Sequence, residues 1–124
     1  MRRSILTGIL VILILGLGYM LYYNVSSPLA MYPGAAKAAL AKGEFDHIVD
    51  VRTDAEWSMG RFPLAIHIPA KQIPQDLPQR IPDKNSKILF YCNTSTRARM
   101  AAEAAQSIGY PNIRYLIGTH KNLL

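Results

Sequence analysis

Apolar and polar positions divide the chain into one long apolar segment and a region of short alternating elements. Ser4 to Tyr23 contains no charged residue and is rich in Ile, Leu and Val. About 20 such residues are needed to cross a hydrocarbon layer of ~30 Å, so the run predicts a transmembrane helix. A cleaved signal peptide is the alternative, since it also has a basic start and an apolar core. We favour an anchor for two reasons. The apolar run is long for a signal core, and in the only small-residue cleavage site, before Met31, Pro28 stands where a small side chain is needed.

The remaining pattern predicts an α/β domain. A polar segment containing Pro28, residues 24–31, is interpreted as a tether. Short apolar and β-branched runs predict strands at 45–51, 66–68, 88–91 and 113–117. Helical patterns occur at 34–42 and 98–108, and Thr53 with Glu56 forms a capping-box pattern that begins a short helix. Alternation of this kind predicts a central parallel sheet with helices on both faces. The expected division is an anchor at 1–23, a tether at 24–31 and one domain at 32–124.

Charge and composition reduce the number of possible functions. The net charge is +6, of which Arg2 and Arg3 supply two charges, and the other basic residues are spread along the domain. The sequence has no basic patch with interleaved aromatic residues, so nucleic acid is not expected as a partner. One cysteine excludes an internal disulfide and a Cys-x-x-Cys cluster, and the three histidines lack ligand spacing, so no metal or other cofactor is expected.

The same two arginines predict the orientation of the apolar helix. Arg2 and Arg3 are the only charges near either end of the span, and the next charge is Lys37. Positive residues favour the cytosolic side, which predicts a single-pass protein with a cytosolic N-terminus and the domain on the non-cytosolic side.

The chemistry is expected at Cys92, between a predicted strand and a predicted helix. Unpaired amides and the positive dipole end of a helix stabilise a thiolate there, and Arg97 adds a full charge. A lone cysteine is often only a small core residue. The polar sequence that follows it, Asn93-Thr94-Ser95-Thr96-Arg97, favours a reactive thiol instead.

These motifs together resemble the single-domain rhodaneses, a sulfurtransferase family that carries sulfur as a cysteine persulfide. The resemblance rests on the Cys92-x-x-x-x-Arg97 loop, on Asp50-Val51-Arg52 with Glu56 upstream, and on Gly60 to Pro69 between them. It extends from about Tyr32 to the C-terminus. It implies a rhodanese-like fold with the site at the carboxyl ends of the strands.

The resemblance also implies roles for individual residues. Cys92 would take sulfur from a small anionic donor such as thiosulfate and pass it to a thiol or to cyanide. Arg97 would bind the anionic donor, and the loop residues would contact the substrate or the persulfide; these are Asn93, Thr94, Ser95 and Thr96. An ion pair among Asp50, Arg52 and Glu56 is expected to hold the rim of the site.

The sequence departs from the family pattern in three places. The usual Gly-His is Gly60-Arg61, the usual Pro-Gly-Ala is Pro63-Leu64-Ala65, and the glycine-rich segment after the last strand is reduced to Ile117-Gly118-Thr119. The last change affects the expected pocket wall and therefore substrate preference.

Two other functions are consistent with these patterns. One is a non-catalytic rhodanese-like binding module at the membrane, against which the intact Cys92 and Arg97 argue. The other is a phosphatase or arsenate reductase of the same fold. Those loops place five residues between cysteine and arginine, whereas four separate them here, which favours sulfur chemistry.

Overall fold

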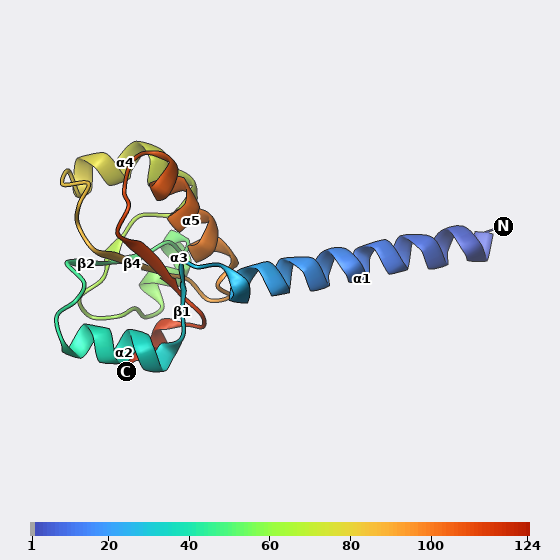
Figure 1. The fold of residues 1–124 in the computed structure, drawn as a ribbon, viewed down its shortest axis with the longest axis horizontal. Helices are drawn as coiled ribbons and strands as arrows, with labels where there is room; N and C mark the ends of the chain where they lie inside the picture. The colour runs from blue at the N-terminus through green and yellow to red at the C-terminus, as the bar shows by residue number, and fades with distance from the viewer. Residues whose placement is uncertain (1) are drawn as a thin grey trace.

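The computed structural model describes residues 2–124, and its first element is a long apolar helix. Helix α1 spans Arg2–Ser26 and extends away from the rest of the molecule as a single rod (Figure 1). Its Ile, Leu and Val side chains are exposed. The helix is long and apolar enough to cross a membrane, and a signal sequence near an N-terminus has the same properties.

The domain is built on a five-stranded parallel sheet, as the alternating pattern predicts. The strand order is β1-β5-β4-β2-β3, and every pairing is parallel. The strands are β1 (Ala30–Met31), β2 (His47–Asp50), β3 (Ile66–His67), β4 (Ile88–Tyr91) and β5 (Ile113–Leu116). The central strand β4 is buried at all four positions, which explains its continuous apolar sequence. The fold class expected from the sequence is confirmed.

Helices cover both faces of the sheet (Figure 1). Helices α4 (Ile73–Arg80) and α5 (Thr96–Ser107) pack on one face, where they form the larger core with residues such as Phe90 and Tyr115. Helix α2 (Pro33–Ala41) and the 3₁₀ helix η2 (His120–Leu123) enclose a smaller core on the other face. Short elements α3 (Asp54–Ser58) and η1 (Ala70–Gln72) follow β2 and β3.

The junction between α1 and the domain differs from the expected tether. Helix α1 continues to Ser26, and Ala30 and Met31 form an edge strand paired with β5. Asn24 is only 4% exposed, and its main-chain carbonyl accepts a hydrogen bond from the buried Tyr115 hydroxyl. Asn24 is therefore packed into the domain and Ala30 and Met31 extend its sheet, whereas Val25, Ser26 and Pro28 are exposed. These contacts are long-range, so the polar, proline-containing composition that suggested a tether does not reveal them.

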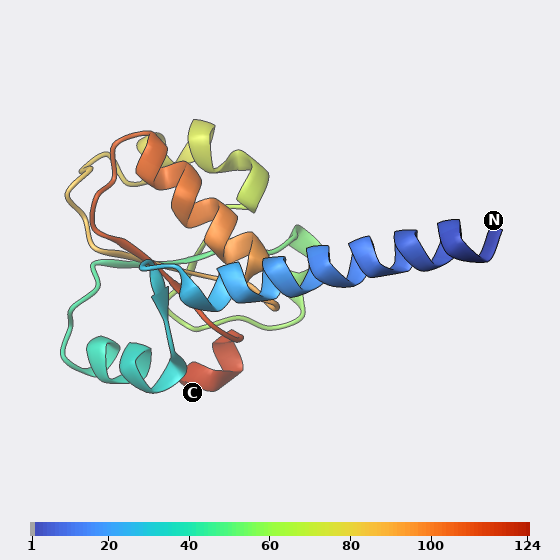
Figure 2. The ribbon, with the colours of Figure 1, turned by 45° about the vertical axis from the view of Figure 1, so that its right-hand side comes forward.

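The same junction joins α1 to α5 directly. The Asn24 side-chain amide donates to Thr96 Oγ1 at 2.9 Å, and Asn24 Oδ1 accepts from Arg99 Nε at 2.7 Å. The Arg99 guanidinium also lies 4.7 Å from the centroid of the Tyr23 ring. Figure 2 shows the start of α5 beside the end of α1. Arg99 thus contributes side-chain contacts between the two helices.

Candidate active site

Cys92 lies where β4 ends, and its side chain is completely buried. The loop turns into α5 through Ser95, which has a positive φ of 69°. The amide N–H of Ala98, in the first turn of α5, donates to Cys92 Sγ at 3.3 Å. This amide and the positive end of the α5 dipole both stabilise negative charge on the sulfur. Cys92 also belongs to the larger core, so it combines the burial of a core residue with an anion-stabilising contact.

The other loop residues have distinct surroundings. Asn93 and Thr94 are exposed, whereas Ser95 is buried. Ser95 Oγ accepts a hydrogen bond from the Gly118 amide at 3.0 Å, and Thr96 Oγ1 accepts from Asn24. Each of these two hydroxyl groups can still donate its own proton. The loop is thereby connected to the segment after β5 and to α1.

Asp50 and Arg52 form the buried ion pair that the sequence predicts at the end of β2. Arg52 Nη2 donates to Asp50 Oδ2 at 2.7 Å, and Arg52 Nε lies 3.0 Å from both carboxylate oxygens. The hydrogen bonds to Asp50 raise the pKa of Arg52. Arg52 Nη2 also donates to the Gly60 carbonyl at 2.5 Å, which ties the end of β2 to the segment after α3.

Glu56 pairs with Arg97 and not with Arg52, which corrects the expected three-residue ion pair. Arg97 Nη1 and Nη2 donate to the two Glu56 oxygens at 2.6 and 2.9 Å. Asn93 Nδ2 donates to Glu56 Oε2 at 2.5 Å, and the Thr53 amide donates to Oε1 at 3.0 Å. The Arg97 hydrogen bond and the Thr53 amide hold the Glu56 pKa well below its usual value. Asp50 already satisfies Arg52, so Glu56 is free to pair with Arg97 in the loop.

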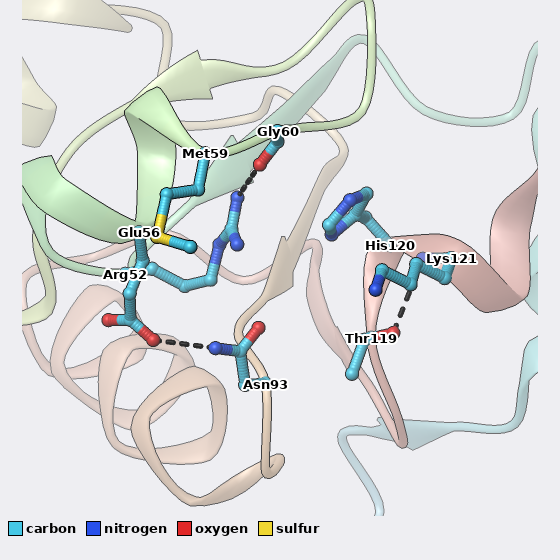
Figure 3. A pocket seen from close by; sticks show the side chains of 8 residues that line it. All are labelled: Arg52, Glu56, Met59, Gly60, Asn93, Thr119, His120 and Lys121. Atoms are coloured by element: carbon cyan, nitrogen blue, oxygen red, sulfur yellow. Dashed lines mark hydrogen bonds between the residues drawn. The ribbon is translucent and has the colours of Figure 1, made fainter.

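A cavity of about 350 Å³ lies beside the loop (Figure 3). Residues from three regions line it: Arg52, Glu56, Met59 and Gly60 on one side, Thr119, His120 and Lys121 on the other, and Asn93 from the loop. The volume falls in the range of small-molecule sites, about 300–1,000 Å³. Arg52 and Asn93 place the cavity at the carboxyl ends of β2 and β4. Asn93 is the loop residue that lines it, whereas Cys92, completely buried, is not among its lining residues.

Sequence reasoning missed the contribution of the segment after β5. Thr119, His120 and Lys121 come from the reduced segment that was expected to alter the pocket wall, and none was chosen as a site residue. No residue pattern identifies them, because η2 reaches the cavity only through the tertiary fold. Among residues 2–124, no group of three or more His, Cys, Asp or Glu side chains could hold a metal ion.

The chain matches one protein family and is similar to parts of several known proteins. The Rhodanese-like domain family model matches residues 32–122. The thiosulfate sulfurtransferase PspE of Escherichia coli is 29% identical over 68 residues, or 55% of this chain and 65% of PspE. The tRNA uridine(34) hydroxylase of Erwinia tasmaniensis is 32% identical over 74 residues, or 56% of this chain and 21% of that protein. The match thus spans less than two thirds of either relative.

A solved sulfurtransferase structure has a similar fold. Human single-domain sulfurtransferase TSTD1 superposes with a TM-score of 0.68, over 77% of this chain and 95% of that one, at 23% identity. At this identity the likeness is one of fold.

Proposed function

Because this chain belongs to the rhodanese-like domain family, we propose that it is a sulfurtransferase that carries sulfur as a persulfide on Cys92. One observation carries the proposal: Cys92 Sγ lies at the start of α5 and accepts the amide hydrogen bond of Ala98. This hydrogen bond would stabilise the negative charge on the sulfur during attack on the donor and in the anionic persulfide that results. The relation to PspE, a thiosulfate sulfurtransferase, supports thiosulfate or a similar anion as donor.

The reaction has two steps. The Cys92 thiolate attacks the outer sulfur of thiosulfate, the sulfur–sulfur bond of the donor breaks, and its electron pair leaves with sulfite. An acceptor nucleophile, a thiolate or cyanide, then attacks the outer sulfur of the Cys92 persulfide. The second sulfur–sulfur bond breaks, its electron pair returns to Cys92, and the thiolate is restored. No metal or organic cofactor takes part in either step.

The neighbouring residues have supporting roles in this proposal. Arg97 and the polar residues from Asn93 to Thr96 bind the anionic donor and stabilise charge on the departing sulfite. Asp50 and Arg52 hold the end of β2 beside the loop. Glu56 positions Arg97 and Asn93, which places it closer to the chemistry than a residue of the rim.

The alternatives predict different behaviour. A binding module would need neither the amide contact to Cys92 nor the fixed position of Arg97. A phosphatase or arsenate reductase needs a loop that surrounds a tetrahedral oxyanion, and the four residues between Cys92 and Arg97 leave less room for one. Both observations favour sulfur transfer.

The same proposal includes a membrane location. Helix α1 anchors the protein uncleaved, with Arg2 and Arg3 on the cytosolic side and the rhodanese-like domain on the other side. Tyr19, Tyr22 and Tyr23 lie at the domain end of α1 and are exposed. Aromatic rings favour the lipid–water boundary, so these residues fit the edge of the bilayer nearest the domain.

Mass spectrometry of the full chain in detergent tests the sulfur chemistry. After incubation with thiosulfate and removal of the excess, the peptide containing Cys92 should carry one added sulfur atom. Cys92→Ser should carry none and should transfer no sulfur to cyanide. A folded wild-type chain that acquires no sulfur from any sulfane donor would instead favour the binding module.

A further inference from the structure

The cavity beside the Cys92 loop has one wall that the proposed sulfur transfer leaves unused. Thr119, His120 and Lys121 form this wall, opposite Arg52 and Gly60 (Figure 3). Asn93, the residue after Cys92, borders the same space. A molecule in the cavity would therefore contact η2 and the start of the Cys92 loop together.

The wall is held in place by hydrogen bonds. Thr119 and Asn122 form a capping box at the start of η2, with the Thr119 amide donating to Asn122 Oδ1 at 2.9 Å. Just before it, the Gly118 amide donates to Ser95 Oγ in the loop. These contacts fix η2 relative to the Cys92 loop, so the position of His120 is defined.

His120 is an unusual residue in this wall. Its side chain lines the cavity, yet the residue is only 7% exposed, and its ring lies 5.7 Å from the ring of Tyr91. The buried Nδ1 has no hydrogen-bond partner among residues 2–124. An unpaired buried polar atom is destabilising, so its presence in a small domain calls for a role.

The surroundings keep the imidazole neutral. Burial lowers the pKa of His120, and the nearby charges of Arg52 and Lys121 lower it further, while Asp50 acts in the opposite direction. The adjacent Tyr91 phenol has a raised pKa, chiefly through burial, and is uncharged. At neutral pH His120 can therefore accept a proton.

We infer that the cavity binds a small thiol as the sulfur acceptor and that His120 is the general base that deprotonates it. This inference rests on the proposed function, of which it specifies the second step. Because Nδ1 is enclosed, the thiol proton goes to Nε2. The resulting thiolate attacks the outer sulfur of the Cys92 persulfide, the Sγ–S bond breaks, and its electron pair returns to Cys92. The products are the acceptor persulfide, the Cys92 thiolate and an imidazolium, which releases its proton to water.

Single-turnover kinetics with two acceptors test the role of His120. The full chain in detergent is loaded with thiosulfate, freed of excess donor, and mixed with either 2-mercaptoethanol or sulfite at pH 8. Sulfite is mostly a dianion at that pH and has no proton to lose. His120→Gln should slow transfer to the thiol by about a hundredfold, within the usual range for a general base, and leave transfer to sulfite within about twofold. His47→Gln, at the opposite end of β2, is the matched control and should change neither rate.

The wild-type pH profile gives a second measurement that needs no variant. With His120 as base, the rate of transfer to the thiol should be level between about pH 7 and 8, above the ordinary imidazole pKa of about 6.5, because the reacting species is the neutral thiol. A rate that rises tenfold per pH unit over that range would show reaction with thiolate from solution and would overturn the inference. Equal losses with both acceptors in His120→Gln, or no loss with the thiol, would also overturn it. A wild-type chain that never acquires sulfur would overturn the proposed function itself.

Discussion

Glu56 holds Arg97 through both carboxylate oxygens, at 2.6 and 2.9 Å, and thereby joins α3 to the Cys92 loop. The pair is partly exposed, with side-chain exposures of 27% for Glu56 and 33% for Arg97. The loop arginine is thus paired with a carboxylate of the protein itself. In the proposed reaction, a donor anion would have to share Arg97 with Glu56 or displace Glu56 from it.

Replacing Arg97 should weaken the use of anionic donors. Arg97→Ala should lower kcat/KM for thiosulfate by roughly tenfold to a hundredfold, which corresponds to a charge-assisted hydrogen bond of about 1.5–3 kcal/mol. Arg97→Lys should restore only part of the lost kcat/KM, because an ammonium group cannot reproduce the planar, bidentate contact of a guanidinium. Arg80→Ala, an exposed residue at the end of α4, is the control. Unchanged kinetics in Arg97→Ala would exclude Arg97 from the donor site.

Breaking the buried pair at the end of β2 should destabilise the whole domain. Asp50→Asn leaves the Arg52 guanidinium buried with a neutral amide and the Gly60 carbonyl as partners. The expected loss is about 3–5 kcal/mol in the free energy of unfolding, measured by denaturant titration of the detergent-solubilised chain. Asp50→Leu combined with Arg52→Met should be less destabilised than Asp50→Asn. A loss below about 1 kcal/mol in the single variant would contradict the pairing.

Changing Asn24 should loosen the joint between α1 and α5. Asn24→Ala leaves Thr96 Oγ1 without its donor and Arg99 Nε without its acceptor, at a cost of about 1–3 kcal/mol in unfolding free energy. Asn24→Asp should retain the contact to Arg99, and its second oxygen can accept a hydrogen bond from the Thr96 hydroxyl, so its loss should be smaller than that of Asn24→Ala. Hydrogen exchange over residues 93–99 should quicken in Asn24→Ala but not in Tyr22→Ala, an exposed residue on the same helix. Equal exchange in all variants would show that α1 does not support the loop.

The contribution of His120 to the stability of the domain should be lost as the pH falls below about 6.5. His120 has a lowered pKa in the folded state, so the unfolded chain binds its proton first on acidification. Stability from the neutral imidazole is complete above the ordinary value of about 6.5 and is lost as the pH falls toward the folded pKa. The Tm values of wild type and His120→Gln should therefore differ at neutral pH and approach each other at acidic pH. A pH-independent difference in Tm would contradict this assignment.

The membrane proposal predicts a defined pattern of protease access. In membrane vesicles of known orientation, the chain should resist carbonate extraction and keep its full length. Protease added on the non-cytosolic side should digest the domain. Digestion only from the cytosolic side would contradict the proposed orientation. Release by carbonate would show that α1 is not an anchor, and a shortened chain would indicate a cleaved signal peptide.

The elements that the sequence predicts best are those with local signals. The strand from Ile88 to Tyr91 has a continuous apolar pattern, and the helix after Cys92 has apolar residues spaced three and four apart. The Thr53–Glu56 capping box depends on a spacing of three residues within one turn, and the structure contains it. Each of these features is determined by neighbours along the chain.

The relationships that escaped prediction are all long-range. Strand β1 has only two residues, too few to show a period, and it exists because β5 offers an open edge. Glu56 and Arg97 are separated by 41 positions, so their pairing depends on the placement of α3 against the loop. His120 reaches the cavity because η2 folds back across the sheet end. Charges and polar groups identify candidates, whereas the fold determines their partners.

In the proposed membrane location, the hydrogen-bonded junction at Asn24 would determine how the protein encounters other molecules. A flexible linker of about seven residues would let a domain wander by roughly 15 Å from the end of its anchor. Here the helix end is hydrogen-bonded to α5, so the domain would turn only as α1 turns in the bilayer. The cavity would keep a constant height and tilt above the lipid. Encounter would then depend on lateral diffusion along the membrane and on the reach of the partner, and a membrane-bound acceptor would need its thiol at that same height.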